Sequence, residues 1–310
     1  MEQRRSEVWE PGIPAPPRSS DTVRNDVLVP AELVPDSDAM PRDTSEASRL
    51  NVTLPLVLFL LTCATTYLMG GLAFSAALMV TLLCHEFGHY LQARRYGVPA
   101  SLPYFIPMPF SIIGTMGAVI AMHPGLGNRR SLFDIAVTGP LAGLVPALAF
   151  SVLGLSLSDV RLLAEHEEAI VLGEPLLFQW LSSWIVGPLA EGQQVFLHPL
   201  AYAGWVGVFI TGLNLLPIGQ LDGGHILYAL LRQKAHVIAT TLLAGAAVAV
   251  VVFGYWGWTL MLFLLALMGP RHPPTAHDDI PLGLGRTCLG WASLLFVVVG
   301  FTPLPFSASS

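Results

Sequence analysis

Residues 82–89 read Leu-Leu-Cys-His-Glu-Phe-Gly-His and contain an H-E-x-x-H motif within a predicted helix. His85 and His89 are four residues apart, so they lie one turn apart on the same face of that helix. Neutral imidazoles in this array bind Zn²⁺ at about 2.0–2.1 Å. Glu86, between them, is placed to take a proton from a water molecule that the metal activates. The motif by itself indicates a zinc hydrolase.

The setting of the motif is apolar, because residues 72–84 are almost all hydrophobic. The chain of 310 residues is 53% hydrophobic and 12% charged, with a mean hydropathy of +0.62, whereas soluble domains carry about 25% charged residues. We therefore expect an integral membrane protein with the metal site inside the lipid bilayer. No basic patch with interleaved aromatic residues is present, so we expect no nucleic-acid partner.

The apolar stretches predict an all-α polytopic membrane protein with six to seven transmembrane helices. The predicted spans lie at about residues 54–72, 74–94, 132–157, 199–216, 237–253, 255–269 and 287–305. The number of spans, six or seven, depends on two regions: how residues 237–269 divide, and whether the apolar stretch with two tryptophans at 175–190 is a span. Gly70-Gly71 predicts a tight turn between the first two spans, and Gly139 and Gly143 give a G-x-x-x-G spacing for close helix packing.

Residues 99–122 are apolar, yet prolines at positions 103, 107 and 109 exclude a regular helix. Non-helical backbone at membrane depth is tolerated only where protein or a water-filled cavity satisfies its polar groups. We expect a re-entrant loop or a short β-hairpin near the metal site. An exposed backbone edge there would pair with an extended peptide.

Charge divides the chain into two predicted domains. Residues 1–50 contain seven prolines and ten of the 21 acidic residues, which predicts a disordered or loosely ordered cytoplasmic arm. Residues 51–310 form the predicted membrane-embedded domain. If the N-terminus is cytoplasmic, every Lys and Arg of the loops except Arg161 falls on the cytoplasmic side. The prediction is a multi-pass protein of the bacterial inner (cell) membrane, with the histidines in the cytoplasmic half of the bilayer.

A catalytic zinc usually has a third protein ligand, and the sequence offers few candidates: Asp134, Glu191, Asp222 and His225. Asp222 is favoured, because it follows a helix break and precedes two glycines that let backbone approach a metal. A carboxylate bound to Zn²⁺ is also relieved of the cost of being an isolated charge in the membrane.

With these residues the chain resembles the site-2 protease family of intramembrane zinc metalloproteases, in its bacterial and plastid branch. In that family an H-E-x-x-H helix and a later Asp-Gly pair hold the metal. Here His85, Glu86 and His89 match the first motif and Asp222-Gly223 the second. The resemblance also covers the run F-D-I-A-V-T-G-P-L-A-G at 133–143, and extends over about residues 54–305. It implies that Asn214, eight residues before Asp222, helps to hold substrate or stabilise an oxyanion.

The resemblance implies one Zn²⁺ per chain, with Glu86 as the catalytic residue and His85, His89 and Asp222 as its ligands. It implies hydrolysis of peptide bonds in or near transmembrane segments of membrane-protein substrates, as in regulated intramembrane proteolysis. The expected partners are transmembrane protein substrates and the lipid bilayer, and the sequence leaves the oligomeric state open. The alternative is a catalytically inactive zinc-binding membrane protein or a metal transporter. A transporter, however, would show several acids or histidines along a path, whereas here they collect at one point.

Overall fold

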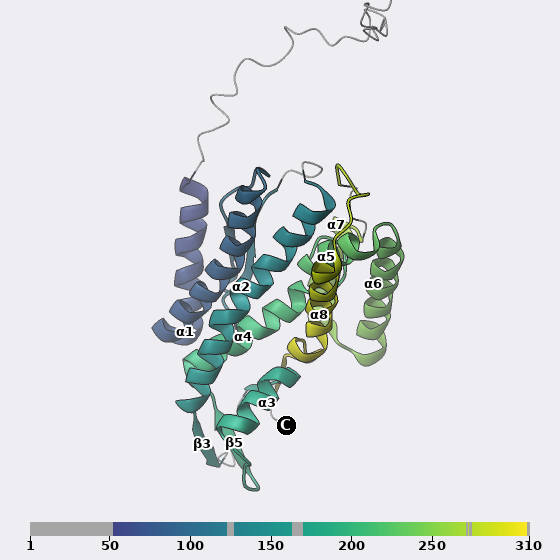
Figure 1. The fold of residues 1–310 in the computed structure, drawn as a ribbon. Helices are drawn as coiled ribbons and strands as arrows, with labels where there is room; N and C mark the ends of the chain where they lie inside the picture. The colour runs from purple at the N-terminus through teal and green to yellow at the C-terminus, as the bar shows by residue number, and fades with distance from the viewer. Residues whose placement is uncertain (1–51, 123–126, 163–169, 271, 273–274, 309–310) are drawn as a thin grey trace, which may run out of the picture. The chain divides into compact units, whose positions relative to one another are not determined.

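The structure is a computed structural model that describes residues 52–122, 127–162, 170–270, 272 and 275–308. The arm predicted at residues 1–50 lies outside this described part. Within the described part the chain is mostly helical, with a few short strands (Figure 1). Three of its helices are long and apolar enough to cross a membrane: Thr53–Arg95, Arg129–Ser156 and Lys234–Phe253.

Helix α1 (Thr53–Arg95) consists of two helical segments that meet at Gly71, where φ is +76° and ψ is −173°. A left-handed φ of this kind favours glycine. The two segments pack side by side (Figure 1), and the hydroxyl groups of Thr66 and Ser75 hydrogen-bond at 2.8 Å across the turn. The predicted turn at Gly70-Gly71 is therefore confirmed, and the second segment carries the H-E-x-x-H motif.

Strands β1 (Tyr104–Pro107) and β2 (Thr115–Val119) form an antiparallel hairpin with a bridge between Ala100 and Met122 at its base. The hairpin packs along α1, where the ring of Phe105 meets Phe59 edge to face at 5.3 Å. Of the two structures expected for residues 99–122, the β-hairpin is the one observed.

Helix α2 (Arg129–Ser156) is capped by Asn128, whose side chain accepts hydrogen bonds from two backbone N–H groups of the first turn. It contacts both α1 and α4 (Pro199–Asn214) closely. The backbones of α2 and α4 approach closely at Gly154 of α2 and Gly204 of α4. A Cβ added at these positions would lie 2.0 Å from Ala201 and 2.4 Å from Ser151, respectively. Helices α1, α2 and α4 thus pack against one another.

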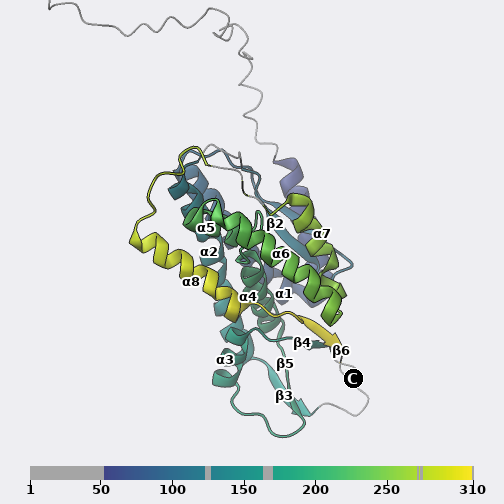
Figure 2. The same ribbon diagram turned by 90° about the vertical axis from the view of Figure 1, so that its right-hand side faces the viewer.

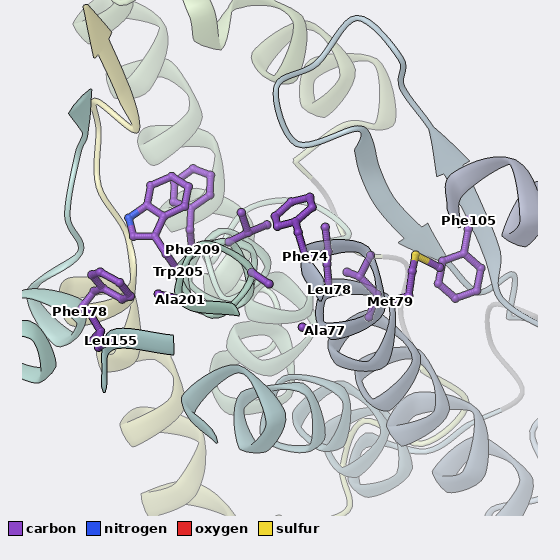
Figure 3. Packing of buried hydrophobic residues seen from close by; sticks show 13 residues of the cluster. Phe74, Ala77, Leu78, Met79, Phe105, Leu155, Phe178, Ala201, Trp205 and Phe209 are labelled. Atoms are coloured by element: carbon purple, nitrogen blue, oxygen red, sulfur yellow. The ribbon is translucent and has the colours of Figure 1, made fainter. Parts of the chain in front are cut away.

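The largest apolar cluster lies where α1, α2 and α4 meet the hairpin and helix α3 (Leu176–Ile185). Figure 3 shows Phe74, Leu78 and Met79 of α1 beside Trp205 and Phe209 of α4. The rings of Trp205 and Phe209 stack at 5.4 Å. Because Phe74, Leu78 and Trp205 are fully buried, this cluster holds the helices in a fixed register.

The C-terminal part contains α5 (Asp222–Leu231), α6 (Lys234–Phe253), a 3₁₀ turn at Trp256–Trp258, α7 (Thr259–Met268) and α8 (Leu284–Gly300). Helix α6 exposes apolar side chains such as Val248, Val251 and Val252. An apolar helix that exposes large aliphatic side chains is suited to contact lipid.

Two further strand pairs lie beside α3, at the end of the bundle where α2 finishes (Figures 1 and 2). Strand β3 (Asp159–Leu162) pairs with β5 (Gln193–Phe196), and β4 (Ile170–Leu172) pairs with β6 (Phe306–Ala308). The all-α prediction did not include them. The strands have three or four residues each, too short for a periodic pattern, and their partners are distant in sequence.

Candidate metal centre

Three side chains from two helices converge on one point: His85 and His89 of α1 and Asp222 at the start of α5. His85 Nε2 lies 3.2 Å from Asp222 Oδ2, and His89 Nε2 lies 3.3 Å from Asp222 Oδ1. The two Nε2 atoms are 3.2 Å apart. Both histidines are buried, with 4% and 7% of their surface exposed.

These separations fit a zinc ion. Tetrahedral ligands bonded to one ion at 2.0–2.1 Å lie about 3.3 Å from one another. The orientation of His89 fits the same conclusion, since its Nδ1 donates to the carbonyl of Ile135 at 2.7 Å. In the neutral ring the other nitrogen, Nε2, then carries a lone pair toward a carboxylate oxygen. A neutral His89 in this orientation therefore presents Nε2 as a metal ligand.

Glycines in α2 make room for the two histidines. A Cβ at Gly139 would lie 2.0 Å from His89 Nε2, and one at Gly143 would lie 2.9 Å from His85 Cβ. The G-x-x-x-G spacing predicted for close packing is confirmed, and the groups packed against it are the histidine side chains. The carbonyl of Ile135 lies on the same helix, so α2 both holds and orients His89.

Asp222 is placed by the turn between α4 and α5. Residues 215–221 break the helix, and α5 begins at Asp222 itself. A Cβ at Gly223 would lie 1.9 Å from the carbonyl oxygen of Leu215, and one at Gly224 would lie 2.3 Å from that of Gly219. The glycine pair therefore lets the first turn of α5 pack on the preceding backbone, which brings the carboxylate to the histidines.

Glu86 and Asn214 lie beside the cluster. Glu86 is 4% exposed, and its carboxyl group interacts electrostatically with His85, His89 and Asp222. The amide nitrogen of Asn214, at the end of α4, lies 3.3 Å from His85 Nε2. All five residues singled out from the sequence are thus assembled in one place.

The other ligand candidates are not part of the cluster. Asp134 accepts two hydrogen bonds of 2.8 Å from Arg286, Glu191 is exposed, and His225 pairs with His272. The hydrogen bonds to Ile135 and His272 were not predicted from the sequence, since a backbone carbonyl carries no side-chain signal and His272 is 47 residues from His225.

Comparison with known proteins agrees with this geometry. The family model "Peptidase family M50" matches residues 73–254, which include all five residues of the site. The chain belongs to peptidase family M50. This is the site-2 protease family, so the resemblance stated from the motifs is confirmed.

Curated relatives of this M50 chain are named as zinc metalloproteases. It is 30% identical over 251 residues to "Probable zinc metalloprotease EGY2, chloroplastic" of Arabidopsis thaliana, covering 77% of the chain and 43% of that relative. It is 34% identical over 233 residues to "Probable zinc metalloprotease EGY1, chloroplastic" of Oryza sativa subsp. japonica, covering 72% and 39%. The chain spans about two fifths of the length of these relatives. No solved structure matches it.

Proposed function

We propose that this M50 chain is an intramembrane zinc metalloprotease that hydrolyses peptide bonds in or near transmembrane segments of membrane proteins. The observation that carries the proposal is the convergence of His85, His89 and Asp222, with Glu86 beside them, within a bundle of apolar helices. Family membership and the relatives' names support a zinc peptidase.

The chemistry follows from the residues. When bound, Zn²⁺ lowers the pKa of water toward about 7 and polarises a carbonyl group. Glu86 accepts the proton of the attacking water and passes it to the leaving amine. Asn214, with its amide nitrogen 3.3 Å from His85 Nε2, is placed to donate to the substrate carbonyl oxygen as negative charge develops on it.

The hairpin offers a way to hold the substrate. A helical substrate hides its carbonyls in its own hydrogen bonds, so the scissile segment has to become extended before hydrolysis. Within the described residues the sheet of β1 and β2 has only these two strands, and β2 exposes Met116 and Val119. We propose that an extended substrate segment adds to this sheet edge.

Charge supports an orientation for the spans. Arg94 and Arg95 end α1, and Arg129 and Arg130 begin α2, while Arg161 lies on β3 at the opposite end of α2. With the larger cluster on the cytoplasmic side, the N-terminus of α1 is cytoplasmic. Six to seven spans, and a bacterial cell membrane as the location, stay predictions; the relatives above are named chloroplastic. Labelling of single cysteines at positions 95 and 161 in intact cells tests the orientation.

The catalytic role of Glu86 is tested by Glu86→Gln in the purified chain, with a model transmembrane substrate in detergent. Glu191→Gln makes the same chemical change at an exposed site and serves as the control. Because general acid–base catalysis contributes about 10²–10⁴-fold, cleavage by the first variant should fall by that factor with its zinc content unchanged. Equal cleavage by all three proteins would overturn the mechanism.

No observation favours the alternative functions. Glu86 and the three ligands are all present, whereas an inactive relative would have lost one of them. Among the described residues, a single group of three or more His, Cys, Asp or Glu converges closely enough to bind a metal, and a transport path would need several such sites along the bundle.

A further inference from the structure

His225 lies one turn after Asp222 on α5, and its side chain contacts His272. Its Nδ1 is 2.7 Å from His272 Nε2, a hydrogen-bond distance and shorter than the separation of about 3.3 Å between two ligands of one zinc ion. One of these nitrogens therefore donates a proton and the other accepts it. The mechanism above uses neither ring.

His225 is the first side chain that can hold Asp222 from within α5, because the two residues between them are glycines. The residue before Asp222, Leu221, gives no side-chain cap to the helix. The backbone N–H of His225 donates to the carbonyl of Leu221, on the other side of Asp222, at 3.0 Å. His225 thus closes the turn that carries the carboxylate, and His272 fixes the ring of His225.

His272 is itself held firmly by the elements around it. It is 9% exposed and stacks on Tyr228 of α5 with ring centres 4.5 Å apart. Its backbone carbonyl accepts a hydrogen bond of 3.0 Å from His236 Nε2 of α6. The hydroxyl of Tyr228 donates to Asp278, at 2.6 Å, in the segment that leads to α8. An anchor tied to α5, α6 and this segment is suited to hold a ring in one orientation.

We propose that His225 is a positioning residue for Asp222 and that His272 is its anchor, so that zinc affinity depends on the hydrogen bond between the two rings. The proposal rests on the proposed function in one respect, that Asp222 is a zinc ligand. Partners that orient a metal ligand typically change metal affinity by about 10–100-fold when they are lost.

The test measures zinc affinity of the purified full chain by competition with a chromophoric chelator, and the visible absorption spectrum of the Co²⁺-substituted protein. His272→Phe keeps a ring to stack on Tyr228 but removes the hydrogen bond. His277→Phe makes the same chemical change at an exposed position of the segment that leads to α8 and leaves the ring pair and its anchor intact, so it is the control. We expect the first variant to lose about 10–100-fold in zinc affinity with an altered Co²⁺ spectrum, and the control to match the wild type.

His225→Phe removes the same hydrogen bond from its other partner, and the double variant completes a cycle. If both residues act through one bond, the double variant loses no more affinity than either single variant. Additive losses, wild-type affinity in His272→Phe, or an equal loss in His277→Phe would each overturn the proposal. A wild-type chain that binds no zinc would instead overturn the proposed function, so the two failures are distinguishable.

Discussion

Gly139→Ala is expected to remove zinc from the site by displacing His89. Gly139 lies on α2 directly against the imidazole, and an added Cβ would lie 2.0 Å from Nε2 and 2.3 and 2.4 Å from Cε1 and Cδ2. The three atoms belong to a ring whose Nδ1 is fixed by the Ile135 carbonyl. Movement of the ring away from Gly139 therefore acts against that hydrogen bond.

The size of the effect follows from these distances. Ordinary van der Waals contact begins at 3.4 Å, so His89 Nε2 has to retreat by about 1.4 Å, whereas metal–ligand distances tolerate about ±0.2 Å. We expect the displaced ring to cease to bind and zinc affinity to fall at least about 100-fold, the upper end for loss of an orienting partner. Overpacking adds about 1–3 kcal/mol of destabilisation.

The assay measures zinc affinity by chelator competition, together with the thermal unfolding midpoint. Two matched substitutions provide a smaller steric conflict and a control without one. Gly143→Ala places a Cβ 2.9 Å from His85 Cβ, a smaller conflict that should cost about tenfold or less. Gly245→Ala on α6 meets no atom within 4 Å and should leave zinc affinity unchanged while stabilising the fold by about 0.4–1 kcal/mol. If Gly139→Ala binds zinc as tightly as Gly245→Ala does, the steric reasoning is wrong.

Three further outcomes are expected. Asp134→Asn should destabilise the fold by about 1–2 kcal/mol, because it removes the charge that accepts two 2.8 Å hydrogen bonds from the partly exposed Arg286; an unchanged unfolding midpoint in detergent would contradict this. Removing zinc with a chelator should lower the midpoint, and zinc restored to about 100 times its Kd should return about 2.7 kcal/mol. Burial raises the pKa of Asp278, but hydrogen bonds from Thr275 and Tyr228 outweigh it and hold the pKa below its usual value. The ionised Asp278 therefore stabilises the fold fully above the unfolded pKa of about 3.9, and this stabilisation is lost as the pH falls through the folded pKa. As the pH is lowered below about 4, the unfolding midpoint of Asp278→Asn should therefore fall less than that of the wild type.

The sequence predicted the features that depend on local pattern. The H-E-x-x-H spacing places two histidines on one helix face, Gly70-Gly71 marks a turn, and the prolines of 99–122 exclude a helix. Asp222 was also predicted, because a helix break followed by two glycines is a local signal of close backbone approach.

Features that depend on distant partners were not predicted. The carbonyl of Ile135 carries no side-chain signal, and the pairing of His225 with His272 joins residues 47 apart. Strands β4 and β6 have three residues each and lie toward opposite ends of the C-terminal half of the chain. In each case tertiary packing, which a single sequence does not encode locally, determines the contact.

The claim that His85, His89 and Asp222 hold a catalytic zinc is tested most directly by elemental analysis of the purified chain. Metal content per chain is measured by mass spectrometry for the wild type and for Asp222→Ala, after dialysis against a weak chelator. We predict a single zinc per wild-type chain and its loss from the variant, because removing one of three ligands leaves two imidazoles to hold the ion. Equal zinc content in the two proteins, or a wild-type chain without zinc, would contradict the claim.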